Sequence, residues 1–179
     1  MSRFDAAPLL ETERLRLRAH AAEDFVATRA LWSDPAVVRL ITGRPASDEE
    51  AWARLLRYAG HWRLMGFGYW LVETKAEGRF VGEVGLADYR RTLDPPRDGV
   101  PEAGWVLAPA AQGRGYAGEA VAAVLAWADA HLSAPETFCM IHPENAASIR
   151  VAERAGYRRN ATGLYGERPT LFLTRPTGG

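Results

Sequence analysis

The sequence has little cysteine, no net charge and no long hydrophobic run. Its 179 residues contain a single cysteine, Cys139, so an internal disulfide is excluded. The formal net charge is zero, from 22 basic and 22 acidic residues, and gives no reason to expect a nucleic acid or an anionic membrane as partner. No apolar stretch approaches the ~20 residues that cross a bilayer, and residues 1–5 lack the apolar core of a signal peptide. We therefore expect a cytoplasmic location.

Several catalytic signatures are also missing. The histidines His20, His61, His131 and His142 are scattered without the spacing of metal ligands, and Cys139 with His142 offers only two ligands. No metal site is therefore expected. A GxSxG nucleophile elbow is absent, which argues against a serine hydrolase. Cys139 itself lies in the apolar run 138–141, where cysteine is usually a core residue.

The chain is rich enough in apolar residues, at 47%, for one domain with a real core, and it is short for two. We expect a single domain over residues 1–179. In residues 12–18, leucines alternate with arginines at the period of a strand that buries one face. Further strands are predicted over residues 68–74, 79–86, 102–107, 137–141, 157–165 and 170–174.

Four segments have helical character. They cover residues 23–32, residues 48–66, the stretch after a glycine loop up to residue 132, and residues 145–156. The first must end before Pro35, because the residue before proline resists helical ψ. Ser47 and Glu50 form a capping box for the second, and Asn145 is a good N-cap for the last, which Gly156 ends.

The order of these elements predicts how the strands pair. Tight turns such as residues 76–78 join the strands before residue 108, which indicates an antiparallel meander. The strand over residues 137–141 instead follows a long helix. It should lie parallel to the strand over residues 102–107, through a right-handed crossover.

The chain is organised around residues 105–132, a strand, a glycine loop and a helix. Pro109 ends the strand because proline cannot continue a sheet ladder. Gly113 and Gly115 then allow unusual φ and ψ and a close approach of a ligand to the backbone. The first N–H groups of the following helix have no internal partner and lie at the positive end of its dipole. Together they predict a site for an anion, namely a phosphate.

Other interpretations of this loop are weaker. Gly113-x-x-x-x-Gly118 begins like a P-loop, but Glu119 stands where a P-loop has lysine. A dinucleotide site requires its first glycine directly after the strand, whereas residues 108–112 intervene here. It also requires an acidic residue at the end of the next strand, where residues 141–143 offer none. A glycine turn before a core helix, without any ligand, remains an alternative.

The loop resembles the acetyl-CoA loop of the GCN5-related N-acetyltransferases (GNAT). That pattern is Gln or Arg, two variable residues, Gly, any residue, and Gly or Ala, which Gln112, Gly115 and Ala117 match. Residues 142–148, followed by residues 155–157, look like the PxNxxS…GF block of the ribosomal-protein-alanine N-acetyltransferase type, a subfamily that modifies protein N-termini. Residues 12–18 and 82–85 fit the same subfamily, so the resemblance covers nearly the whole chain.

The resemblance implies a fold and a cofactor site. The fold is mixed α+β, with a mostly antiparallel twisted sheet of about seven strands and about four helices. In the family, two parallel strands splay apart after a bulge in the first and leave backbone groups free for the pantetheine arm of acetyl-CoA. The first two helices form one wall of the acceptor groove, so Trp32 and residues 41–45 are expected either at the substrate or in the core. The cofactor-binding residues would be Val106, Leu107, Gln112, Gly113, Arg114, Gly115, Tyr116, Ala117, Asn145 and Ser148.

Acetyl transfer from a thioester to an amine also needs catalytic groups. A backbone N–H near Val106 or Leu107 would polarise the carbonyl. Glu102 and Glu167 are the candidate bases, with water as a relay, and an α-amine with a pKa near ~8 is easier to deprotonate than a lysine near ~10.4. Many family members place a tyrosine four residues before the glycine that closes the last helix.

This chain has Ala152 at the position of that tyrosine, and the subfamily points to Ser148 as the hydroxyl near the thiol. Ser148 would alternatively bond the backbone locally. The leading hypothesis is an acetyl-CoA-dependent N-acetyltransferase that acts by direct attack in a ternary complex. Its acceptor would be a primary amine, either a protein N-terminus or a small molecule.

Two further hypotheses remain open. Because Ala152 lacks a hydroxyl, the chain would alternatively be a catalytically weak CoA-binding regulatory or sensor domain. A nucleotide-binding α/β module is the third hypothesis. Residues 88–102 do not identify the acceptor, and the sequence is compatible with a monomer or a homodimer.

Overall fold

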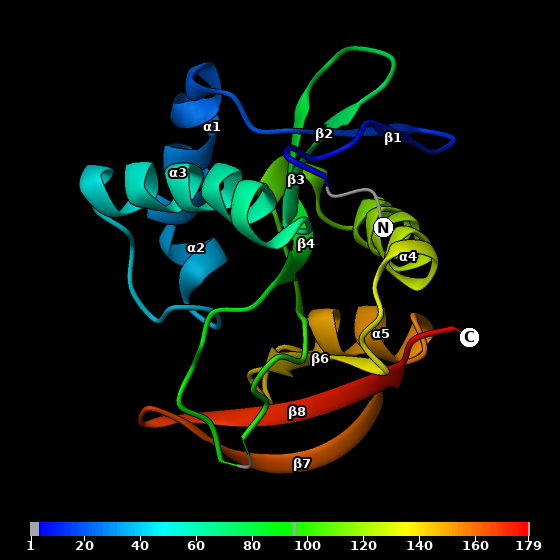
Figure 1. The fold of residues 1–179 in the computed structure, drawn as a ribbon. Coiled ribbons are helices and arrows are strands. Elements are labelled where there is room, and N and C mark those ends of the chain that lie inside the picture. The colour runs from blue at the N-terminus through cyan, green and yellow to red at the C-terminus, as the bar shows by residue number, and fades with distance from the viewer. Residues whose placement is uncertain (1–3, 95, 179) are drawn as a thin grey trace.

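A single twisted sheet runs through the molecule, with helices on both sides of it (Figure 1). The structure is a computed structural model that describes residues 4–94 and 96–178. Residues 1–3, 95 and 179 lie outside this description. The predictions of a single domain over residues 1–179 and of an N-terminus without a signal peptide therefore fall partly outside the described residues.

The strand order in the sheet is β1-β2-β3-β4-β5-β6-β8-β7. All neighbours are antiparallel except β5 and β6, which are parallel. This confirms the mixed fold, the meander and the parallel crossover. Within the described residues the strands are β1 (Leu10–Glu11), β2 (Leu15–Arg18), β3 (Tyr69–Thr74), β4 (Phe80–Ala87), β5 (Glu102–Leu107), β6 (Glu136–Ile141), β7 (Arg158–Tyr165) and β8 (Arg168–Pro176).

The helices divide between the two sides of β4. Figure 1 shows α1, α2 and α3 on one side and α4 on the other. Within the described residues, no helix has the length and apolar character needed to cross a bilayer. The helical elements are η1 (Ala22–Asp24), α1 (Phe25–Ser33), α2 (Pro35–Val38), α3 (Asp48–Met65), η2 (Pro109–Ala111), α4 (Tyr116–His131) and α5 (Ala146–Arg154).

Two short elements, β1 and α2, were not predicted. The two residues of β1 are too few for a period-two pattern, and they pair with β2 across a turn closed by Thr12 N–H and Leu15 O. Helix α2 begins at Pro35, whose missing N–H costs nothing at the first helical position. Asp34 caps it by accepting from Ala36 N–H at 2.8 Å. Proline thus ends one helix and begins the next.

Tryptophans form the centre of the core. Trp62 of α3, Trp70 of β3 and Trp127 of α4 are almost completely buried, and their rings meet edge to face with centroids 4.6 to 5.3 Å apart. Such aromatic pairs add about 0.5–1.5 kcal/mol each beyond their burial. The packing holds the sheet between α3 and α4.

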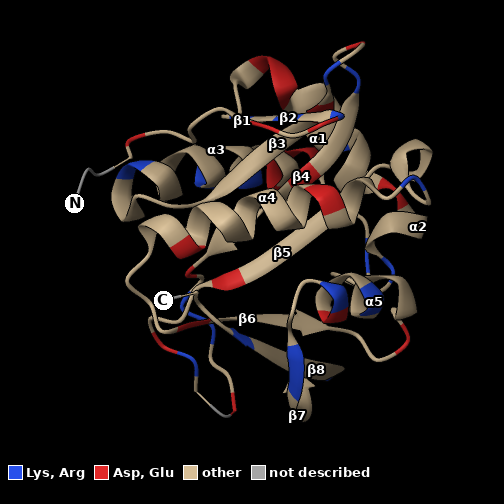
Figure 2. Ribbon diagram, turned by 90° about the vertical axis from the view of Figure 1, so that its right-hand side faces the viewer, with Lys and Arg blue, Asp and Glu red and all other residues tan. Residues whose placement is uncertain are grey.

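The parallel strands β5 and β6 separate almost as soon as they meet. They pair only at Glu102 and Phe138, and Figure 2 shows them diverging from that point. The expected splay is therefore present. Against β4, the register of β5 runs without a shift from Glu102 to Leu107, so no bulge interrupts this pairing. The opening comes from the loss of pairing with β6 rather than from a register shift against β4.

Candidate active site

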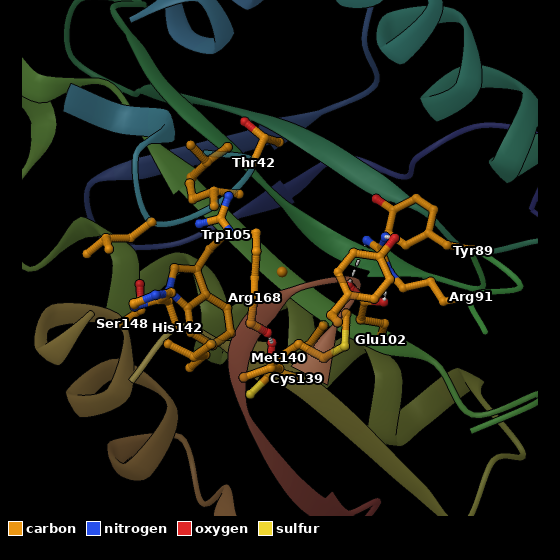
Figure 3. Close-up of a pocket in the computed structure, with 18 of the residues that line it drawn as sticks. Thr42, Tyr89, Arg91, Glu102, Trp105, Cys139, Met140, His142, Ser148 and Arg168 are labelled. Atoms are coloured by element: carbon orange, nitrogen blue, oxygen red, sulfur yellow. Dashed lines mark hydrogen bonds and ion pairs between the residues drawn. The ribbon is translucent and has the colours of Figure 1, made fainter. Parts of the chain in front are cut away.

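A cavity of about 990 Å³ opens where β5 and β6 diverge. Its wall includes residues from α3, β5, β6, the first turn of α5 and the start of β8. Figure 3 shows Ser148 and His142 at one end of the pocket and Glu102, Arg91 and Tyr89 at the other. The predicted catalytic residues Glu102 and Ser148 thus face one cavity from different ends.

The glycine loop leaves backbone N–H groups without partners. Gly113 has φ +74° and Gly115 has φ +79°, so both adopt the left-handed conformation that glycine allows. Within the described residues, the N–H groups of Gly113, Arg114 and Gly115 have no hydrogen-bond partner. The bond that closes the first turn of α4 runs from Glu119 N–H to Gly115 O at 3.2 Å. These free donors at a helix N-terminus suit a diphosphate.

Gln112 holds the glycine loop in place through both its backbone and its side chain. Its N–H already donates to Pro109 O at 3.2 Å, and its side chain donates to Leu107 O at 3.1 Å. This N–H group is therefore not free to bind an anion. Gln112 instead fixes the loop to the end of β5, and the cradle begins at Gly113.

Glu119 connects the glycine loop to the N-terminal part of the chain. It accepts hydrogen bonds from Thr12 Oγ1, from Arg14 N–H at 2.9 Å and from Arg14 Nε at 2.7 Å. Arg14 also donates to Arg114 O at 3.0 Å. Burial opposes ionisation of Glu119, but Thr12 and Arg14 hold its pKa below the ordinary value. Residues 12–14 thus support the loop, a role that sequence reasoning missed.

Strand β5 presents backbone groups to the cavity. Val106 and Leu107 are buried, and both belong to the part of β5 that no longer pairs with β6. In an antiparallel pair, alternate residues direct their N–H and C=O groups away from the partner strand. On β5 these groups point toward the space that β6 has left. This is the geometry that a backbone donor to a thioester carbonyl requires.

Asn145 and Ser148 combine a structural role with free polar atoms. Asn145 Oδ1 accepts from Ser148 N–H at 3.1 Å and so caps α5, as predicted. Both residues line the cavity. Among the described residues, neither Asn145 Nδ2 nor Ser148 Oγ has a hydrogen-bond partner. Both atoms therefore remain available to a ligand, because the cap uses only Asn145 Oδ1 and the Ser148 N–H group.

Glu102 is the carboxylate that the fold places in the cavity wall. It is 8% exposed and accepts from Arg91 Nε at 2.7 Å and from Arg91 Nη2 at 3.2 Å. Burial raises the pKa of Glu102 above its ordinary value, although Arg91 and Arg57 oppose this shift. A raised pKa brings a carboxyl group closer to the working range of a general base.

The second candidate base, Glu167, lies elsewhere. It is exposed in the turn between β7 and β8 and does not line the cavity, although residues 165, 166 and 168–170 around it do. The structure does not bring Glu167 together with Glu102. Ala152, at the position of the family tyrosine, is fully buried, and the nearby Tyr157 bonds Thr137 inside the core at 2.7 Å.

Glu83 is a buried carboxylate that sequence reasoning did not identify as functional. It accepts from Thr28 Oγ1 at 2.8 Å, Trp32 Nε1 at 2.8 Å and the Tyr58 hydroxyl at 3.0 Å. Burial would raise the pKa of Glu83, but His20, Trp32 and Thr28 hold it below the ordinary value. Because Trp32 and Tyr58 line the cavity, Glu83 orients two of its wall residues.

Trp32, part of residues 41–45 and Cys139 lie in the wall or the core, where the sequence placed them. Trp32, Ile41 and Thr42 line the cavity, and Trp32 is also buried, so it serves both the wall and the core. Cys139 is 1% exposed, and burial raises the pKa of its thiol. Among the described residues, no group of three or more His, Cys, Asp and Glu side chains is arranged to hold a metal ion.

The acetyltransferase (GNAT) domain family matches residues 14–158. The chain belongs to the GNAT family. A protein from Bordetella pertussis, described as a GNAT-family acetyltransferase, is 30% identical, with a TM-score of 0.82 over 94% of this chain and 99% of that chain. An acetyltransferase from Agrobacterium tumefaciens is 28% identical, with a TM-score of 0.81 over 94% of each chain.

A curated relative adds chemical information. The FsC-acetyl coenzyme A-N(2)-transacetylase of Aspergillus fumigatus is 33% identical over 84% of this chain and 65% of its own length. Together with the family match, this makes the chain an acetyl-CoA-dependent N-acetyltransferase. The free loop amides and the splayed strands fit that donor, and the nucleotide-binding alternative is excluded.

Proposed function

We propose that this GNAT enzyme acetylates a primary amine that binds in the 990 Å³ cavity and attacks acetyl-CoA directly in a ternary complex. The observation that carries the proposal is the single pairing point of β5 and β6 at Glu102 and Phe138. Because the strands part there, one cavity reaches from Asn145 and Ser148 to Glu102. Donor and acceptor can therefore occupy one cavity together, as direct attack in a ternary complex requires.

Acetyl-CoA supplies the acetyl group as an activated thioester. Glu102, through a chain of water molecules along the cavity, takes a proton from the acceptor ammonium, and the freed nitrogen attacks the carbonyl carbon. The backbone N–H of Leu107, which the register of β4 and β5 directs away from β4, stabilises the charge on the carbonyl oxygen. As the C–S bond breaks, Ser148 Oγ donates a hydrogen bond to the sulfur. Overall the ammonium nitrogen loses two protons: the first passes through Glu102 to solvent, and the second, lost as the tetrahedral adduct collapses to the amide, balances the proton that the sulfur gains.

The glycine loop binds the diphosphate of acetyl-CoA. The N–H groups from Gly113 to Ala117 hold the diphosphate, and the exposed Arg114 side chain adds positive charge. Tyr116 and Ala117 begin α4 and so lie at the positive end of its dipole. Asn145 Nδ2 donates to the pantetheine arm.

We assign the chain to the ribosomal-protein-alanine type on its motifs. The fold supports this only broadly: the ribosomal-protein-S5-alanine acetyltransferase of Vibrio fischeri is 18% identical with a TM-score of 0.77. A spermidine N-acetyltransferase of Vibrio cholerae, which is also 18% identical, has a TM-score of 0.73. The proposal includes a cytoplasmic location and a monomer or homodimer, which cell fractionation and size-exclusion chromatography test.

The decisive experiment measures CoA binding and turnover separately. Calorimetry with CoA at up to millimolar concentration tests the loop, and release of free thiol from acetyl-CoA, with a panel of peptides and small amines, tests transfer. We expect binding, and acetylation of at least one amine. Ser148→Ala should slow turnover by a larger factor than it weakens CoA binding. No binding of CoA by the folded protein would refute the proposal.

A sensor domain is the second candidate, because the buried Ala152 cannot protonate the leaving thiolate. It predicts normal CoA binding, slow hydrolysis of acetyl-CoA and no transfer to any amine in the panel. Robust acetylation of one acceptor excludes it.

A further inference from the structure

We propose that the acceptor is a small amine that also carries a carboxylate, and that arginines of the cavity bind this carboxylate. The inference rests on the proposed function, since it assumes that the amine enters the cavity described above. The carboxylate would lie at the end of the cavity where Figure 3 shows Arg91, Tyr89 and Glu102. The chemistry is an ion pair between guanidinium and carboxylate.

The cavity wall carries an excess of positive charge, although the chain as a whole carries none. Five arginines and two carboxylates line it, a formal excess of three positive charges. Both carboxylates are already paired, Asp88 with Arg90 at 3.1 Å and Glu102 with Arg91 at 2.7 Å. The arginines that remain, with no ion pair to any described carboxylate, are Arg54, Arg57 and Arg168.

Arg54 is the most constrained of the three. Its guanidinium lies 3.5 Å from the centroid of the Trp32 ring. Its Nε is buried and has no hydrogen-bond partner in the part of the chain that the structure describes. Burial lowers the pKa of Arg54, but Tyr58, Tyr89 and Glu83 raise it overall, so the guanidinium is held in its charged form. A carboxylate in the cavity would add an ion pair, which Arg54 makes with no described residue.

Arg57 and Arg168 approach the same cavity from α3 and from β8. Arg57 is exposed and lies 5.0 Å from the centroid of the Tyr89 ring, on which Arg91 also lies, at 4.5 Å. Arg168 donates to Arg39 O at 3.0 Å and projects into the pocket in Figure 3. The wall thus offers guanidinium groups from two separate parts of the fold.

The arginines beside Tyr89, namely Arg57 and Arg91, do not serve the diphosphate of CoA. The glycine loop follows Leu107, whereas Glu102 and its arginine partner lie at the other end of β5. At about 3.3 Å per residue, the two ends of this strand are roughly 17 Å apart. The positive charge beside Tyr89 and Glu102 therefore belongs to the acceptor side of the cavity.

The charge of the wall selects among amines. A polycation would meet unpaired guanidinium groups and be repelled, whereas an amine with a carboxylate would neutralise them. A cavity of about 990 Å³ that also receives the pantetheine arm leaves room for a small acceptor. An amino acid or a short peptide with a free carboxylate has this chemistry and size.

The test compares acceptors that differ only in the carboxylate. Free thiol released from acetyl-CoA is measured with β-alanine against β-alaninamide, with glycylglycine against glycylglycinamide, and with spermidine, each rate corrected for the fraction of unprotonated amine. We expect kcat/KM to be at least about 10-fold higher for each acid than for its amide. The preference should fall as salt is added, because screening weakens the ion pairs.

Variants assign the preference to the arginines. Arg57→Gln and Arg168→Gln should each lower the acid-to-amide ratio by about 10-fold, and Arg57→Glu should lower it further. Arg63→Gln, on the same helix but outside the cavity wall, is the matched control and should leave the ratio unchanged. A ratio between two acceptors is insensitive to a general loss of stability.

The outcomes separate the two proposals. Equal or faster reaction of the amides or of spermidine overturns the carboxylate inference and leaves the acetyltransferase function standing. If no acceptor reacts, calorimetry of β-alanine and β-alaninamide with the CoA-loaded protein decides the inference. Weaker or equal binding of the acid overturns it. Failure to bind CoA would instead refute the proposed function.

Discussion

Arg91 binds both carboxylate oxygens of Glu102, through Nε at 2.7 Å and Nη2 at 3.2 Å. Its guanidinium also stacks on Tyr89 and donates to the Tyr165 hydroxyl at 2.6 Å. The pair stands where β5 and β6 are joined, since Glu102 and Phe138 are the one pair of residues that the two strands share among the described residues. Arg91 therefore fixes the position of the proposed base and connects the β7–β8 hairpin to the cavity.

The first prediction concerns pH. Burial raises the pKa of Glu102 and Arg91 lowers it, with a net upward shift. A base works only when ionised, so kcat/KM should fall as pH drops through this raised pKa. Arg91→Gln removes the lowering contribution and should move the acidic limb of the pH profile to higher pH. Glu102→Gln should reduce kcat by about 100-fold or more and remove the limb.

The control for this profile is Glu167→Gln, in the exposed turn outside the cavity wall. It should leave both the rate and the limb unchanged. A limb that persists in Glu102→Gln, or that disappears in Glu167→Gln, would reverse the assignment of the base.

The second prediction concerns the glycine loop. Gly115→Ala and Gly99→Ala both place a Cβ on a residue with positive φ, at +79° and +74°. Each should lose about 1–2 kcal/mol of stability in urea denaturation. Only Gly115→Ala should also weaken CoA binding, by about 10-fold or more in calorimetry, because it redirects the amides at the start of α4. Equal CoA affinities in the two variants would contradict a backbone cradle.

The third prediction separates the two roles of Asn145. Asn145→Ala removes the cap of α5 and should cost about 1 kcal/mol of stability. Asn145→Asp keeps the oxygen that accepts from Ser148 N–H and should preserve stability. Both variants lack the side-chain N–H donor, so both should bind CoA more weakly in calorimetry. Full CoA affinity in Asn145→Asp would show that Asn145 acts only as the N-cap of α5.

The fourth prediction concerns the buried Glu83. Glu83→Gln leaves Trp32 and Tyr58 opposite an amide and should cost about 1–3 kcal/mol in urea denaturation. Because the folded protein lowers the pKa of Glu83, its carboxylate contributes stability above the unfolded pKa, which is lost as pH falls through the folded pKa.

The variant should therefore lose less stability on acidification than the wild type. Glu49→Gln, on the exposed first turn of α3, is the comparison and should change neither quantity. If Glu83→Gln is as stable as the wild type and its stability depends on pH in the same way, the Glu83 carboxylate does not stabilise the positions of Trp32 and Tyr58.

Local sequence signals predicted much of the fold because their causes are local. Ser47 and Glu50 form the capping box, and Asn145 caps α5, as expected from side chains that bond backbone N–H groups only three residues away. Gly156 has φ +90° just after α5, where helices commonly end in glycine. The Gly113 and Gly115 conformations follow from the same reasoning.

The sequence by itself therefore determined the order of the longer strands and helices, the glycine loop and the family. Only the tertiary structure decided which charged groups meet. Glu119 reaches Arg14 across 105 positions of the chain, and Glu83 reaches Trp32 across 51. Arg54 and Arg168 line one cavity because α3 and the β7–β8 hairpin flank the splayed strands. No sequence period encodes such contacts, since they arise from the packing of separate elements rather than from neighbours along the chain.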